Sequence, residues 1–224
     1  RASRAWKLTV GVAISLGLIG YFGMWDDTMR TLSIITVCTL LSIVLGIPIG
    51  ILMSGSKRIQ GIVTPILDVM QTMPAFVYLI PVVMLLGIGK IPGVIAVVIY
   101  AIPPVIRLTN LGIRLVDKEV LEASAAYGAN RWQTLWGVQM PLAMPTIMAG
   151  INQTIMMALA MVVIASMIGV KGLGQPVLKA ITNQYFTLGL FNGLAIVALA
   201  IIFDRVSQAY AKRAQRHLGG DHHE

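Results

Sequence analysis

Long apolar runs are the feature that most constrains this sequence. A helix needs about 20 mostly apolar residues to cross a bilayer. Hydrophobic residues make up 57% of the chain and charged residues only 12%, which is far too apolar for a soluble domain of 224 residues. We therefore predict an all-α membrane protein with about six transmembrane helices. The predicted spans are residues 8–24, 31–53, 62–87, 91–106, 142–168 and 188–203.

The third predicted span, residues 62–87, carries residues that interrupt a membrane helix. Asp68 and Gln71 are polar, and Pro74 and Pro81 lack the backbone N–H that an internal helical hydrogen bond needs. Sharp kinks usually coincide with proline. This span is therefore predicted to be kinked or broken, and Asp68 is interpreted as a residue near the membrane interface.

Basic residues gather in the segments between the apolar runs. Cytoplasmic loops carry an excess of lysine and arginine, which fixes the orientation of a membrane protein. Six spans put both termini on one side, and assigning that side to the cytoplasm places every basic cluster there. We therefore predict cytoplasmic termini, with the first run a retained helix rather than a cleaved signal peptide. The clusters are Arg1/Arg4/Lys7, Lys57/Arg58, residues 107–131 and the tail after Asp204.

The sequence offers little for catalysis, metal binding or nucleic-acid binding. Cys38 is the only cysteine and lies inside an apolar run, so neither a disulfide framework nor a metal cluster is expected. His217, His222 and His223 fall in the C-terminal tail, where a disordered end is the simpler interpretation. No basic stripe with interleaved aromatic residues indicates a nucleic-acid surface. We expect no catalytic residue, no metal site and no nucleic-acid partner.

The chain also lacks the sequence of a phosphate-binding loop. The pattern GxxxxGK[ST] is absent, because the pair Gly89-Lys90 is followed by Ile91. The spans are nearly free of the ionisable groups that proton- or sodium-coupled carriers keep near the midplane. If the chain moves a solute uphill, ATP hydrolysis has to come from another subunit. The chain itself is expected to be no enzyme and to hold no cofactor.

Residues 115–141 form a charged segment between two apolar runs. Asp117 is a suitable N-cap for a short helix, and Gly128 suits its end because glycine accepts a left-handed conformation. Val120, Ser124 and Tyr127 fall on one face of this helix. We predict a short helix that lies at the cytoplasmic membrane face.

A second short helix is predicted directly after the first. Asn130 is a suitable N-cap, and Gln133 three positions later completes the spacing of a capping box. Pro141 marks the start of the next apolar run.

A few polar residues lie deep in the predicted spans. Asn152, Gln153 and Thr154 are consecutive, and Gln71 and Thr72 precede Pro74. Such residues either line a polar path or hydrogen-bond to neighbouring helices, and the second interpretation is the simpler one. Four residues are candidates for a translocation path: Pro74, Tyr78, Asn152 and Gln153.

The 115–141 segment resembles a known motif. Glu122-Ala123-Ser124, three residues, Gly128, nine residues and Val138-Gln139-Met140-Pro141 are similar to the EAA motif, Glu-Ala-Ala, three residues, Gly, nine residues, Ile-x-Leu-Pro, of ABC-importer permeases. Ser124, Val138 and Met140 depart from it with side chains of similar volume. Residues 31–205 as a whole resemble the permeases that import glycine betaine and proline betaine.

The resemblance implies the fold and the partners of a type I ABC importer permease. The expected partners are a second permease copy, two ATPase subunits that bind ATP and Mg, an extracytoplasmic substrate-binding protein and membrane lipid. It also implies a place in the bacterial plasma membrane. The residues expected to couple the chain to the ATPase are Leu121, Glu122, Ala123, Ser124, Ala125, Tyr127, Gly128 and Pro141.

The resemblance points to a quaternary amine such as glycine betaine or proline betaine as the solute. Trimethylamine N-oxide, choline and carnitine are alternatives, and an osmosensing channel is an alternative from another class. Quaternary ammonium groups are held by several aromatic rings together. The aromatic residues are scattered along the chain, so the sequence predicts no such cage in this subunit.

The sequence shows no internal repeat and no marked change of composition. One domain is expected, with a permease core at residues 31–207. An N-terminal membrane helix with its outer turn, residues 1–30, precedes it, and a cytoplasmic tail, residues 208–224, follows it.

Overall fold

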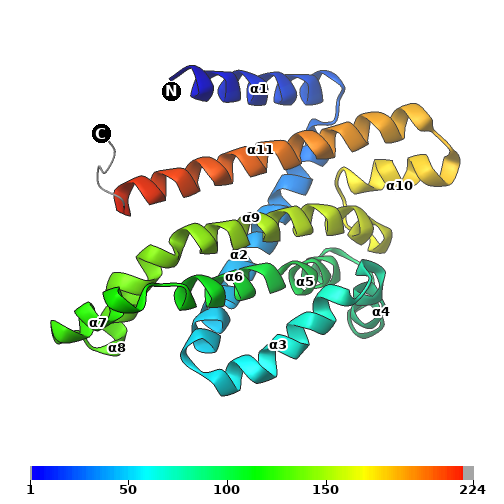
Figure 1. Cartoon of the computed structure of the whole chain (residues 1–224). Coiled ribbons are helices and arrows are strands. Elements are labelled where there is room, and N and C mark those ends of the chain that lie inside the picture. Colours follow the sequence, from blue (N-terminus) through cyan, green and yellow to red (C-terminus); the bar gives the residue numbers. More distant parts are fainter. Residues whose placement is uncertain (1, 219–224) are drawn as a thin grey trace. The chain divides into compact units, whose positions relative to one another are not determined.

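The computed structural model describes the backbone of residues 2–218 and the side chains of residues 10–209, and all regular structure in that part is helical. The side chains of His217, His222 and His223 lie outside it. In chain order (Figure 1) the elements are α1 (Ala2–Tyr21), α2 (Trp25–Gly55), α3 (Lys57–Thr72), α4 (Ala75–Leu86), α5 (Lys90–Ala101), α6 (Pro103–Arg114), α7 (Lys118–Ala126), α8 (Arg131–Thr134), the π turn η1 (Leu135–Gln139), α9 (Met140–Ala165), the 3₁₀ turn η2 (Ser166–Ile168), α10 (Gly174–Asn183) and α11 (Phe186–Leu218).

Four helical stretches of the described residues are long and apolar enough to cross a membrane: 25–55, 90–114, 131–168 and 186–209. Helices α3 and α4 make a fifth candidate as a bent pair, with 102° between them. The predicted break of the third span is therefore confirmed, and Pro74 is the N-cap residue of α4. The first apolar run forms a shorter apolar helix, Val10–Tyr21, so length and composition support four or five of the six predicted spans.

The fourth span is longer than predicted. It does not end before Arg107 but continues to Arg114, because α6 starts again after a single non-helical residue. Pro103 and Pro104 occupy the first positions of α6, where the missing N–H has no helical partner to lose. The two prolines therefore mark a joint inside the span.

The chain divides into two compact units. Unit 1 comprises residues 2–41, 73–101 and 155–205, and unit 2 comprises residues 42–72, 102–154 and 206–218. Helices α2, α9 and α11 each contribute residues to both units.

Close backbone packing holds unit 2 together. A Cβ added to Gly50 of α2 would lie 2.6 Å from Thr109 Cβ of α6, and one added to Gly150 of α9 would lie 3.2 Å from the Pro104 carbonyl oxygen. Small residues at such contacts let membrane helices approach and pack by van der Waals contact. Val105 is fully buried beside Gly46 of α2 and Gly150 of α9, and it belongs to the apolar core of the unit.

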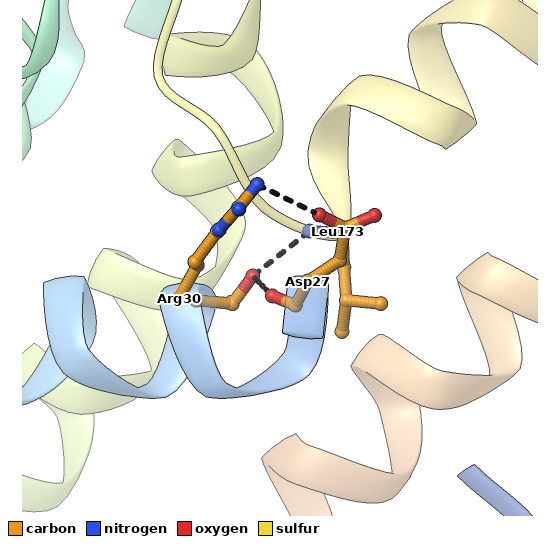
Figure 2. Close-up of polar contacts among 4 residues, drawn as sticks. Asp27, Arg30 and Leu173 are labelled. Atoms are coloured by element: carbon orange, nitrogen blue, oxygen red, sulfur yellow. Dashed lines mark hydrogen bonds and ion pairs between the residues drawn. The ribbon is translucent and has the colours of Figure 1, made fainter. Parts of the chain in front are cut away.

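Unit 1 contains a loop that is fixed to α2. The buried Thr31 hydroxyl donates a hydrogen bond to the Asp27 carbonyl oxygen at 2.8 Å and accepts one from the Leu173 N–H at 2.9 Å (Figure 2). Gly172 has φ +153°, and a Cβ there would lie 2.5 Å from Thr31 Oγ1. Only glycine fits this close approach, so the loop before α10 has one defined path across the start of α2.

Candidate functional site

The first helix of the 115–141 segment has a defined end on each side, as predicted. Asp117 accepts a hydrogen bond from the Glu119 N–H at 3.0 Å, which caps the start of α7. At the other end the Gly128 N–H donates to the Ala125 carbonyl at 2.9 Å and the Ala129 N–H donates to the Ser124 carbonyl at 3.1 Å. With φ +80° at Gly128, these two bonds form a Schellman motif. The predicted glycine stop is confirmed.

The second helix of the segment begins as predicted but does not end as a short helix. Asn130 and Gln133 form the capping box, with both side chain to backbone hydrogen bonds at 2.8 Å. Helix α8 then passes through the π turn η1 into α9 without a break (Figure 1). Pro141 lies inside this continuous helix just after the π turn, so the helix lacks one backbone N–H donor at that point. The prediction of a separate second helix is wrong.

A side-chain hydrogen bond joins the two capped helices. Ser124 Oγ of α7 lies 3.1 Å from Thr134 Oγ1 of α8, and both side chains are half-buried. All of these residues belong to unit 2. Helix α7 is therefore attached to the start of the long helix α8–η1–α9 through the turn at Gly128 and through this hydrogen bond.

The outer surface of the segment is exposed and carries both charged and apolar side chains. No residue of α7 is buried, and Tyr127 after it is 94% exposed. Leu121 is half-buried, whereas Glu122, Ala123 and Ala125 are exposed. An exposed large aromatic side chain next to small residues is typical of a docking site, and the charged residues beside it offer partners for salt bridges.

Two exposed tryptophans follow on α8 and η1, and neither was among the predicted site residues. Trp132 is 70% exposed and Trp136 is 57% exposed. Their spacing of four residues puts them on one face of a helix, a signal that the sequence contains.

Two further contacts of α6 tie it to α3 and to the end of α2. The Arg107 guanidinium forms an ion pair with the Asp68 carboxylate of α3. Arg114 at the end of α6 donates a hydrogen bond to the Met53 carbonyl oxygen at 3.3 Å. Arg107 was predicted to lie in a loop, but it is a helical residue with a carboxylate partner.

The four candidate path residues fall in different units. In unit 1, Pro74 is exposed and Tyr78 is buried, with its ring centroid 5.6 Å from that of Tyr100. In unit 2, Asn152 Oδ1 accepts a hydrogen bond from Ser207 Oγ at 2.6 Å, while Gln153 is exposed. Asn152 therefore hydrogen-bonds to a neighbouring helix, which was one of the two roles considered for the polar residues inside the spans.

No group of three or more His, Cys, Asp or Glu side chains that could hold a metal is found within residues 10–209. Cys38 is buried, with its sulfur 3.9 Å from the Val94 carbonyl oxygen.

Comparison with known proteins gives a consistent picture. Residues 42–216 match the family model described as "Binding-protein-dependent transport system inner membrane component". The chain is 49% identical over 215 residues to the glycine betaine/carnitine transport permease protein GbuB of Listeria monocytogenes, covering 96% of this chain and 76% of that protein. It is 52% identical to the glycine betaine/proline betaine transport system permease protein ProW of Escherichia coli, covering 93% of this chain but only 60% of that protein.

A more distant relative and two solved structures complete the comparison. The trimethylamine N-oxide transport system permease protein TmoV of Pelagibacter ubique is 41% identical, covering 93% of this chain and 30% of that protein. An inward-facing structure of the MetNI methionine ABC transporter matches with a TM-score of 0.76 at 20% identity, covering 86% of this chain and 96% of the other. An amino acid ABC transporter structure matches with a TM-score of 0.71 at 21% identity, covering 88% and 97%. At these identities the structures show a shared fold.

Proposed function

The chain belongs to the family of binding-protein-dependent transport system inner membrane components, and we propose that it is the permease subunit of an ATP-driven importer for glycine betaine, proline betaine or a similar quaternary amine. The relatives that are 49% and 52% identical are named as transport proteins for glycine betaine with carnitine or proline betaine. The trimethylamine N-oxide relative is more distant, which makes that solute the second candidate.

The observation that carries the coupling role is the exposure of α7. A helix with no buried residue, a cap at each end and a fixed attachment to a long membrane helix is suited to receive force from another protein. An ATPase subunit would contact Leu121, Glu122, Ala123, Ser124, Ala125, Tyr127 and Gly128, and Pro141 would stand where the motion passes into α9.

The proposed route of that force follows the covalent and hydrogen-bonded structure of unit 2. A push on α7 reaches α8 through the Gly128 turn and the contact between Ser124 and Thr134. Because α8, η1 and α9 are one continuous helix, the push acts on a membrane-spanning segment without a flexible loop between them.

The proposed complex contains a second copy of this chain, two ATPase subunits that bind ATP and Mg, and an extracytoplasmic binding protein. In the proposed orientation both termini and the 115–141 segment face the cytoplasm. This agrees with the basic residues in and just before that segment, Arg107, Arg114, Lys118 and Arg131. Pro74, Tyr78, Asn152 and Gln153 remain the candidates for the translocation path.

Reconstitution into proteoliposomes with the ATPase and the binding protein tests this proposal. We expect uptake of glycine betaine only when ATP is present on the side of the membrane that the ATPase subunits face. Uptake should stop when the ATPase is omitted. Flow of solute down its gradient without ATP or partner subunits would instead indicate a channel and would contradict the proposal.

A further inference from the structure

A surface pocket of about 620 Å³ lies in unit 1, between the α1–α2 turn and the start of α11. Its size is within the range of about 300–1,000 Å³ that small-molecule sites have. No lysine or arginine belongs to its lining in the described part of the chain. The lining residues that matter for its chemistry are Phe22, Asp27, Tyr185, Phe186 and Phe191.

The pocket brings together aromatic rings from two distant parts of the sequence. The Phe22 and Phe191 ring centroids are 4.7 Å apart with an interplanar angle of 33°, so these rings form one wall. Tyr185 and Phe186, at the turn into α11, line the same pocket. No aromatic cage was predicted from the sequence, but four aromatic residues line this one pocket.

A carboxylate completes the lining. Asp27 is half-buried in the first turn of α2, and its Oδ1 is 3.7 Å from Arg30 Nη1, near the outer limit for an ion pair. A carboxylate has about four acceptor positions, so this one loose contact leaves Asp27 able to attract another cation. The bond from Thr31 to the Asp27 carbonyl and the loop at Leu173 hold this turn of α2 in place (Figure 2).

We propose that this pocket is a binding site of the permease for the quaternary ammonium group of its solute; the ligand class rests on the proposed function. A quaternary ammonium ion has no N–H to donate, so hydrogen-bonding side chains cannot recognise it. Aromatic rings and a nearby carboxylate attract it through charge. The candidate path residues Pro74 and Tyr78 do not line the pocket, which makes it a separate site in unit 1.

The charge of Asp27 also predicts the relative affinities of different ligands. Its negative charge repels the carboxylate of glycine betaine but not the hydroxyl of choline. The site is therefore expected to bind tetramethylammonium and choline at least as tightly as glycine betaine. This order would distinguish the pocket from a binding protein that selects glycine betaine.

Aromatic side chains also gather at membrane interfaces for reasons unrelated to a ligand. The two explanations differ in their dependence on ligand charge. Purified chain in lipid nanodiscs, without partner subunits, is dialysed to equilibrium against radiolabelled tetramethylammonium. We expect saturable binding that choline displaces and that 3,3-dimethyl-1-butanol, the uncharged isostere of choline, displaces at least about tenfold more weakly. Equal displacement by both compounds, or no saturable binding, would overturn the proposal.

Substitutions locate the binding. Phe191→Leu and Asp27→Asn are each expected to weaken tetramethylammonium binding about five- to tenfold, whereas Phe191→Tyr keeps a ring and retains it. Phe203→Leu is the matched control, since Phe203 is half-buried on the same helix outside the pocket. Thermal unfolding of each variant checks the fold. An equal loss in the Phe203→Leu variant, or no loss in the other two, contradicts the assignment.

The binding assay and the transport assay test different proposals, so one proposal can be refuted while the other is supported. If the chain binds tetramethylammonium with the expected charge dependence but imports no quaternary amine, the binding site is supported and the proposed solute is refuted. If the chain imports glycine betaine but does not bind tetramethylammonium, the proposed function is supported and the binding-site proposal is refuted.

Discussion

Ser124 Oγ and Thr134 Oγ1 lie 3.1 Å apart and join the short exposed helix α7 to the start of the long helix that α8 opens. A neutral hydrogen bond of this kind contributes about 0.5–1.5 kcal/mol. The bond matters because of its position: it links the proposed docking helix to the membrane-spanning helix that would move.

Removing this hydrogen bond should loosen coupling more than it lowers stability. Thr134→Val keeps the shape of the side chain and removes the hydroxyl, so the two helices remain folded but are held less firmly. We expect fewer solute molecules imported per ATP hydrolysed, measured as uptake and phosphate release in the same proteoliposomes. Ser124→Ala combined with Thr134→Val should match either single change, since all three remove one bond. Additive losses would show that the two hydroxyls act independently.

Reversing the charge of Glu122 should abolish coupling and leave the protein folded. Glu122 is exposed on α7, so Glu122→Lys alters the surface offered to the ATPase and no buried contact. We expect loss of ATP-driven uptake, with normal insertion judged by membrane fractionation. Glu119→Lys is the matched control, because Glu119 is exposed on the same helix outside the proposed coupling residues. Normal uptake by the Glu122→Lys variant would remove the docking assignment.

Gly128 should tolerate substitution only by residues that accept a positive φ. Its φ of +80° costs a β-branched side chain more than about 1–2 kcal/mol, and asparagine much less. Gly128→Val is therefore expected to lose uptake, while Gly128→Asn keeps a substantial part of it. Open space surrounds the Gly128 Cβ position, so a difference between the two variants reports on backbone conformation rather than on a clash. Equal uptake by both would contradict this explanation.

Thr31 should be important for the stability of unit 1. Thr31→Val leaves the buried Leu173 N–H without an acceptor, which costs about 1–3 kcal/mol, whereas Thr31→Ser keeps the hydroxyl. We expect a lower unfolding temperature in detergent for the valine variant alone. Thr36→Val is the control, because the Thr36 hydroxyl is exposed and bonds only within α2, to the Leu32 carbonyl. A similar decrease for Thr36→Val would assign the effect to helix propensity.

The sequence predicted local features better than distant ones. The caps at Asp117 and Asn130 and the stop at Gly128 depend on residues a few positions apart, and all three are confirmed. The broken third span was predicted for the same reason, since a proline acts on its own turn.

Features that need two distant segments were not predicted. The ion pair between Asp68 and Arg107 joins residues 39 positions apart, and the Thr31 to Leu173 bond joins residues 142 positions apart. The aromatic pocket was missed for the same reason, because Phe22 and Phe191 meet only in the folded chain. The roles of the coupling and path residues stay predictions until transport is measured.

The π turn between α8 and α9 has a consequence for the faces of the helix. In a regular α-helix, residues four apart lie on the same side. Trp132 and Trp136 follow this rule and are both exposed, but Met140 four residues later is 8% exposed and packs against Ile113. A π turn holds one extra residue, which changes the angular phase of the helix by about 100°. The extra residue therefore lets one unbroken helix show its aromatic side outward at one end and its apolar side to the core at the next turn.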